Sequence, residues 1–202
     1  MKKIAIVTLS DFNNYGNRLQ NYALERIITS QGYDVVSLVD FRPNLLKNSV
    51  KTIIKKDGIK FTDKMKKIRR LKKFLDFDKK YVNTFPVNAG EFNSISDDEY
   101  HCFIVGSDQV WNPDWAKYTY DRMFLRFCSP TKRISYAASF GVDKIPEKWV
   151  DKYKAGLIDF KALSVREDKA VDIVKNTIGI TCHKVLDPTM LLERAEWDKI
   201  KK

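Results

Sequence analysis

The chain alternates short apolar runs with longer amphipathic stretches over most of its length. Six runs rich in β-branched or apolar residues are predicted strands: Ile4 to Leu9, Val35 to Val39, Cys102 to Val105, Arg133 to Ala137, Ala162 to Val165 and Lys184 to Leu186. Helical spacing of apolar residues predicts four helices: Asn17 to Gln31, Glu147 to Ile158, Asp168 to Asn176 and Arg194 to Lys201. In the first helix one stripe holds Leu19, Tyr22, Ala23, Arg26 and Ile27. This alternation predicts an α/β fold with a doubly wound, mainly parallel, Rossmann-like sheet.

A strongly basic segment interrupts the alternation. Residues 45–80 contain 14 Lys or Arg and four Asp, so they carry +10 of the formal charge of +11 of the whole chain. The segment is predicted to form two helices, Leu45 to Lys56 and Phe61 to Tyr81, hinged at Asp57-Gly58. An apolar stripe runs along the second helix and consists of Phe61, Met65, Ile68, Leu71, Leu75 and Phe77. The sequence therefore predicts a basic helical insertion.

The charge of the insertion has three interpretations. It is either the solvated face of a helical hairpin, or a surface attracted to an anionic membrane or a lipid-linked pyrophosphate, or a nucleic-acid site. Nucleic acid is the weakest of the three, because the aromatic side chains that would stack on bases lie in the apolar stripe and no known module is present. Because stripe and charge are self-contained, the segment is expected to be separable from the sheet.

Composition indicates a globular protein, and the cysteines and the N-terminus indicate the cytoplasm. Its 202 residues are 44% hydrophobic and 31% charged, enough to form one core without disulfides. Cys102, Cys128 and Cys182 are odd in number and form no CxxC pair, so they are interpreted as buried thiols in a reducing compartment. The first apolar run is too short for a signal-peptide core, and nothing approaches a membrane span. We expect a cytoplasmic protein, peripheral at the inner face of the membrane if the insertion binds lipid.

Polar side chains follow several predicted strands. In a parallel sheet the carboxyl ends of the strands form the ligand crevice. After the first strand, Asn13 to Arg18 leads directly into a helix whose free N–H groups could receive an anion or a sugar hydroxyl. The same residues fit an ordinary helix cap, with Gly16 at positive φ and Asn17 as the cap.

The loop after the third strand is richer in polar groups than a turn requires. Ser107, Asp108, Gln109 and Asn112 surround Trp111 there, whereas helix capping needs only one such side chain. This loop is therefore a candidate binding site.

The fourth and fifth strands also end in candidate residues. Residues 135–141, which include Ser139, are mostly small, and they permit close approach of either a ligand or a packed helix. The fifth strand is followed by Arg166, whose planar guanidinium can give two parallel bonds to a carboxylate or phosphate. The alternative is an ion pair of Arg166 with Glu167 or a neighbouring acid.

Several common functional motifs are missing from the sequence. There is no GxGxxG, GxxxxGK[ST] or GxSxG, so nicotinamide cofactors, P-loop nucleotides and nucleophile-elbow hydrolysis lack support. His101 and His183 lie at strand beginnings, away from the ligand edge, and no metal-binding pattern is present. The sequence predicts neither a cofactor nor a metal site.

Five motifs in a fixed order resemble those of the polysaccharide pyruvyl transferase family. They extend from the first strand to Thr189 and are Tyr15 to Leu24, Val105 to Asn112, Ser135 to Gly141, Ser164 to Glu167 and Leu186 to Thr189. The resemblance implies transfer of a pyruvyl group from phosphoenolpyruvate to a sugar of a cell-surface glycan or its lipid-linked precursor. It implies Arg166 as the donor-binding catalytic residue. It also implies substrate-binding roles for Asn17, Ser107, Asp108, Gln109 and Ser139.

The resemblance also implies a two-lobed architecture similar to that of GT-B glycosyltransferases. Chains of the family usually extend further, so residues 1–202 are expected to form the N-terminal lobe, with the C-terminal lobe absent and the lobe alone inactive. Two other functions remain open. A nucleotide-sugar glycosyltransferase would share the fold, and a binding or scaffold domain would use the lobe without catalysis.

Overall fold

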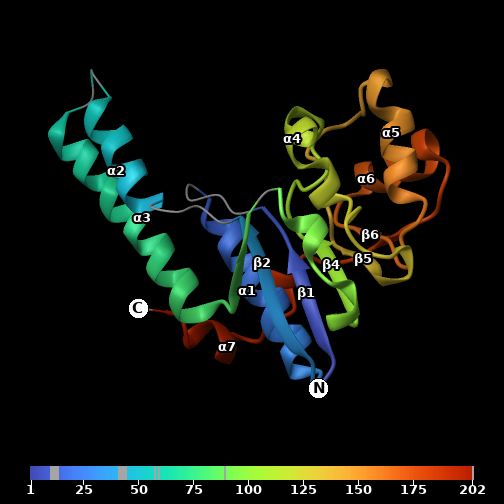
Figure 1. Ribbon diagram of the computed structural model, residues 1–202, viewed down its shortest axis with the longest axis horizontal. Coiled ribbons are helices and arrows are strands. Elements are labelled where there is room, and N and C mark those ends of the chain that lie inside the picture. The colour runs from blue at the N-terminus through green and yellow to red at the C-terminus, as the bar shows by residue number, and fades with distance from the viewer. Residues whose placement is uncertain (10–13, 41–44, 57, 59, 89, 202) are drawn as a thin grey trace.

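Figure 1 shows the computed structural model, which describes residues 1–9, 14–40, 45–56, 58, 60–88 and 90–201. Its centre is a sheet of five parallel strands in the order β3-β2-β1-β4-β5. The strands are β1 (Lys3–Val7), β2 (Asp34–Asp40), β3 (Thr84–Val87), β4 (Cys102–Gly106) and β5 (Arg133–Tyr136). The predicted α/β fold with a mainly parallel sheet is confirmed.

Two short strands continue the sheet beyond β5. β6 (Ser164–Val165) pairs in parallel with β7 (His183–Lys184). Isolated parallel bridges from Ile134 to Ala162 and from Ala138 to Val165 connect β6 to the β5 side of the main sheet. The last two predicted strands are therefore real but shorter than the sequence suggested.

The helices lie on both faces of the sheet (Figure 1). They are α1 (Tyr15–Ser30), α2 (Leu45–Lys55), α3 (Phe61–Tyr81), α4 (Pro113–Met123), α5 (Glu147–Leu157), α6 (Asp168–Asp172) and α7 (Arg194–Asp198). A π-helical turn, Ile173–Ile178, continues α6, and 3₁₀ turns occur at Phe92–Ser94, Asp97–Glu99, Pro130–Lys132 and Pro188–Met190. Strand β3 and helix α4 were not predicted.

Each central strand contributes to two cores, because successive side chains of a strand point to opposite faces. Ile4 and Ile6 of β1 pack with Leu24 and Ile28 of α1, while Ala5 and Val7 face the larger core on the other side. Cys102 and Cys128 are buried and Cys182 is half-buried, all three as free thiols. None of the helices that the structure describes combines the length and the apolar content needed to cross a bilayer.

The stripe predicted for α1 is only partly buried, since Tyr22 and Ala23 are buried but its other three members are not. Leu19, Arg26 and Ile27 are only half-buried. Near its start α1 instead presents buried polar side chains to the sheet: Gln20 donates to the Thr8 hydroxyl at 3.1 Å. Because α1 starts at the carboxyl edge, its first turns meet hydroxyl and carboxylate groups there, and apolar packing begins only further along.

The basic insertion is a helical hairpin with two unlike parts. The helices α2 and α3 match the predicted ranges closely, and their connected ends project from the body in Figure 1. The C-terminal half of α3 packs on α1, where Leu71 and Phe74 are buried and the Phe74 ring stacks on Tyr15 at 4.5 Å. The base of the hairpin therefore belongs to the main body, whereas its tip does not.

This division predicts two different outcomes of deletion. Replacing residues 48–66 with a short Gly/Ser linker should preserve one cooperative unfolding transition, because none of the residues described in this range is buried. Removing 45–80 also removes Phe74 and should lower Tm strongly. Thermal unfolding of both deletion variants checks this. Loss of cooperative unfolding in the 48–66 deletion would show that the tip also belongs to the core.

Candidate functional site

All six predicted site residues lie along the carboxyl edge of the sheet. Asn17 is in the first turn of α1, after β1, while Ser107, Asp108 and Gln109 follow β4. Ser139 follows β5, and Arg166 comes directly after β6. Hydrogen bonds that involve a side chain connect five of the six into two groups. Ser139 is joined to Asp108 only through the backbone, by its N–H to the Asp108 carbonyl at 2.9 Å, and its hydroxyl accepts from Gly141 in its own loop.

The first group joins the start of α1 to the end of β4. Asn14, not Asn17, caps the helix, and its side chain accepts from the Asn17 N–H at 3.2 Å. Gly16 does not have positive φ, so the predicted capping arrangement is wrong in both respects, and Asn13 lies outside the described residues. The amide side chain of Asn17 is thereby free of a capping role. Its Nδ2 donates to Asp108 Oδ2 at 2.7 Å.

Both oxygens of Asp108 are occupied. Oδ2 receives Asn17, and Oδ1 accepts from the backbone N–H of Gln109 at 2.8 Å. Asn17 Oδ1 in turn accepts from Arg18 Nη1 at 2.7 Å, and Arg18 forms an ion pair with Asp78 of α3 at 2.9 Å. A polar chain thus runs from the end of β4 through α1 to the hairpin.

The second group is centred on Asp187. Its Oδ2 accepts from Ser107 Oγ at 2.7 Å and from Arg166 Nη1 at 2.9 Å. Its Oδ1 accepts from the backbone N–H and the hydroxyl of Thr189, at 2.9 and 2.6 Å. Burial by itself would raise the pKa of Asp187, but the hydrogen bonds outweigh it and hold the pKa below its ordinary value. Asp187 is therefore a fixed anion that positions Arg166.

Arg166 has a second carboxylate partner in Glu167. Its Nε donates to Glu167 Oε1 at 2.8 Å, so the ion pair weighed as the alternative at this position is present. Burial would lower the pKa of Arg166, but the bonds to Asp187 and Glu167 raise it overall. The Glu167 side chain is 40% exposed and that of Asp187 is 16% exposed. Glu167 is consequently the partner that an incoming anion could displace at lower cost.

A pocket of about 290 Å³ lies beside Arg166. Its polar lining comes from Gln109, Ser139, Asp143, Arg166, Glu167 and Lys169. Asn17, Ser107 and Asp108 do not line it and lie in the network next to it. The carboxyl edge therefore holds an anchored guanidinium at an open pocket.

Gly141 lines this pocket and lies close against the Gln109 side chain. Its φ is +64°, and a Cβ built there would lie 2.4 Å from Cδ of Gln109. Its N–H donates to Ser139 Oγ at 3.1 Å. Only glycine accommodates both the backbone conformation and the close Gln109 side chain.

Gly141→Ala should therefore destabilise the protein more than a matched substitution elsewhere. Gly179 also has positive φ, +80°, but no atom lies within 4 Å of its added Cβ. Gly179→Ala should lower the free energy of unfolding by about 1–2 kcal/mol, because alanine is strained at positive φ. Gly141→Ala should have the same strain and must also displace the Gln109 side chain. Urea unfolding of both variants measures the difference. Equal losses would mean that Gln109 moves aside freely.

Two acids of this site, Asp187 and Glu167, were not predicted as site residues. Asp187 was part of the Leu186 to Thr189 motif but was not named as a site residue, and Glu167 was considered only as a partner of Arg166. Asp187 lies in a turn after a strand of only two residues, so no strand pattern pointed to it. Among the described residues, no group of three or more His, Cys, Asp or Glu is placed to hold a metal. His101 and His183 lie at strand beginnings, as predicted.

A family model of known proteins matches nearly the whole chain. The family model described as polysaccharide pyruvyl transferase matches residues 14–202. Searches of curated proteins and of solved structures found no significant match. The matched region begins at the cap of α1 and includes every candidate site residue described above. The chain therefore belongs to the polysaccharide pyruvyl transferase family.

Proposed function

We propose that the protein transfers a pyruvyl group from phosphoenolpyruvate to a sugar of a cell-surface glycan or its lipid-linked precursor. The observation that carries this proposal is Arg166, which Asp187 anchors at a pocket on the carboxyl edge of the sheet. Phosphoenolpyruvate bears a carboxylate and a phosphate, and a planar guanidinium suits either group.

Donor binding would proceed by exchange of carboxylates at Arg166. Glu167 holds Nε in the structure and is the more exposed of the two partners. The donor carboxylate or phosphate would replace Glu167, while Asp187 keeps Nη1 in place. Lys169 lines the same pocket and would add positive charge near the donor.

The reaction must join two acceptor hydroxyls to one carbon of the donor. Both hydroxyl oxygens bond to C2 of phosphoenolpyruvate, the bond from C2 to the phosphate oxygen breaks, and phosphate leaves. One hydroxyl proton is delivered to the C3 methylene, which becomes the methyl group of the ketal, and the other leaves with phosphate. Positive groups around the donor stabilise the charge that develops as phosphate departs.

The charge of the site supports a two-lobed enzyme. Arg166 and Lys169 are outnumbered by the carboxylates Asp143, Glu167 and Asp187, so the edge does not by itself compensate a multiply charged donor. We propose that this chain is the N-terminal lobe of a GT-B-like enzyme and that a second lobe supplies further cations and closes the cleft. We further propose a cytoplasmic location for the enzyme, with peripheral attachment to the membrane.

A donor screen tests the proposed function. In the enzyme that contains this chain together with the proposed second lobe, phosphoenolpyruvate should raise Tm, while a UDP-sugar at the same concentration should not. The shift should increase in Glu167→Gln, because the competing carboxylate is gone. A response to UDP-sugars without a response to phosphoenolpyruvate would favour a nucleotide-sugar glycosyltransferase instead. No response to either donor would favour a binding or scaffold domain.

A further inference from the structure

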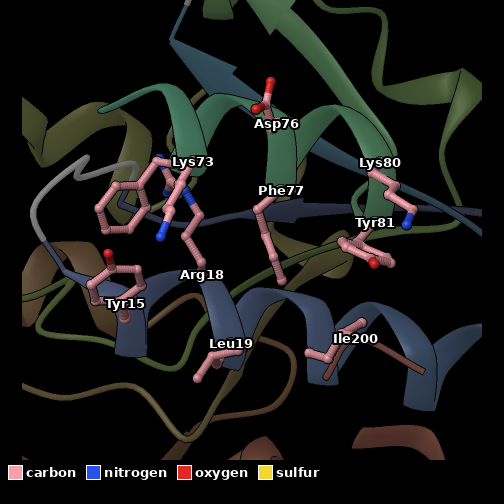
Figure 2. Close-up of a pocket in the computed structure, with 10 residues that line it drawn as sticks. Tyr15, Arg18, Leu19, Lys73, Asp76, Phe77, Lys80, Tyr81 and Ile200 are labelled. Carbon is pink, nitrogen blue, oxygen red and sulfur yellow. The ribbon is translucent and has the colours of Figure 1, made fainter. Parts of the chain in front are cut away.

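A second pocket, of about 340 Å³, lies between α1 and α3 at the base of the hairpin (Figure 2). Its apolar lining comes from both helices and from the chain after α7: Leu19, Phe77, Tyr81 and Ile200. In Figure 2 the Phe77 side chain points from α3 toward α1. Removing apolar surface of this kind from water lowers the free energy, so this lining favours a ligand with an apolar part.

Cationic side chains surround this apolar lining. Lys73 and Lys80 lie two turns apart on α3 and are both exposed, and Arg18 contributes from α1. Arg18 is neutralised by Asp78, so the lysines carry the net positive charge of the rim. The acid in the lining, Asp76, points away from α1 in Figure 2. An apolar pocket with a cationic rim fits a molecule that has an apolar body and an anionic group.

The pocket suits an aliphatic chain better than an aromatic base. The rings of Tyr15 and Phe74 stack on each other at 4.5 Å, and the Arg70 guanidinium lies 5.4 Å from the centroid of Tyr15. The Lys80 ammonium lies 4.8 Å from the centroid of Tyr81. These ring faces already have partners, so the flat stacking surface that a nucleobase needs is occupied.

The rest of the hairpin points to a membrane as the source of such a molecule. Exposed basic residues continue along α3 and include Lys66, Lys67, Arg69, Lys72 and Lys79. Near the tip, Phe61 is 76% exposed and Ile54 is 55% exposed. Cations combined with exposed apolar side chains are typical of segments that bind the interface of an anionic bilayer.

We propose that the pocket between α1 and α3 binds the apolar chain of a phosphate-bearing membrane lipid. The phosphate lies at the Lys73 end, and the chain extends along Leu19 and Phe77 toward Tyr81. The basic surface of the hairpin attaches the protein to the anionic membrane, and the pocket then binds one lipid. This binding does not depend on pyruvyl transfer, so it can be tested without an acceptor or a second lobe.

A short-chain lipid separates pocket binding from surface attraction. Dihexanoyl phosphatidic acid, used below its micelle concentration, should bind the protein in calorimetry, while inorganic phosphate at the same concentration should not. Lys73→Glu should weaken this binding about tenfold, which corresponds to about 1.4 kcal/mol. The control is Lys66→Glu, which makes the same charge change on α3 outside the pocket. It should change the affinity less than twofold.

A second variant and a vesicle measurement complete the test. Leu19→Trp should obstruct the path of the apolar chain between α1 and α3 and weaken lipid binding at unchanged Tm. Co-sedimentation with phosphatidylglycerol vesicles, compared with phosphatidylcholine vesicles, should weaken in both Lys73→Glu and Lys66→Glu. An equal loss of affinity for the short-chain lipid in the two lysine variants would overturn the proposal that the pocket binds lipid. It would indicate a nonspecific attraction between the basic surface and the anionic lipid. Binding of inorganic phosphate as tight as that of the lipid would show a plain anion site and overturn it as well.

Discussion

Arg166→Lys should lower kcat/KM for pyruvyl transfer at least about 30-fold, a loss of about 2 kcal/mol in transition-state stabilisation. Lysine keeps the charge but cannot hold Asp187 with one nitrogen and the donor with another. Stability should barely change, because Asp187 keeps its bonds from Ser107 and Thr189. Release of phosphate from phosphoenolpyruvate gives the rate, measured on the enzyme that contains this chain together with the second lobe that we propose. Thermal unfolding gives the stability.

Variants of the two partners of Arg166 distinguish a donor-binding role of Arg166 from a structural one. Asp187→Asn should reproduce the loss of activity, because the anchored position of Arg166 depends on that carboxylate. Glu167→Gln should instead lower KM for the donor, since it removes a competitor for Arg166. If Arg166→Lys keeps wild-type transfer and loses Tm, Arg166 is a structural ion-pair residue and the proposed donor site is wrong.

Trp111→Ala should have the largest effect on stability. The Trp111 side chain is fully buried and packs on Phe140 at 5.3 Å between ring centroids. Its indole N–H donates to the Met123 carbonyl at 2.9 Å, and its own carbonyl accepts from the Tyr153 hydroxyl at 2.8 Å. Truncation leaves a large cavity and an unpaired carbonyl, and it should remove about 3–5 kcal/mol from the free energy of unfolding.

The matched control for this substitution is Trp149 on α5. Its ring is half-buried and meets Tyr153 edge-on at 6.3 Å, so Trp149→Ala should cost clearly less. Urea unfolding of both variants, with the m-value checked for two-state behaviour, measures the difference. Similar losses would contradict the central position that we assign to Trp111.

The sheet was predictable from the sequence because its central strands are apolar on both faces. Strand β3 was missed since it has four residues, contains Pro86 and directly follows a lysine-rich helix. The stripe of α1 was misjudged for a different reason. Its buried face contains Glu25, whose carboxylate accepts from the Asn83 N–H at 2.9 Å, and such a partner 58 residues away leaves no local pattern.

The candidate site was predictable as a location more than as a set of contacts. Placing polar residues at strand ends identified Ser107, Asp108 and Arg166, because parallel strands bring their carboxyl ends to one edge. The sequence could not show that Asp187 joins Ser107 to Arg166. That contact depends on where a two-residue strand places the following turn. Trp111 was grouped with these polar residues by proximity, yet its ring lies in the core.

The start of α1 places two consecutive residues in two different networks. Successive side chains of a helix point about 100° apart, so Asn17 reaches Asp108 at the sheet edge while Arg18 reaches Asp78 beside the hairpin pocket. The Asn17 and Arg18 side chains also bind each other at 2.7 Å. The first turn of α1 therefore supports both the network at the sheet edge and the hairpin pocket. A substitution that changes one of these two sites is expected to affect the other. Homologues that changed their hairpin would be expected to carry compensating changes at positions 17 and 18.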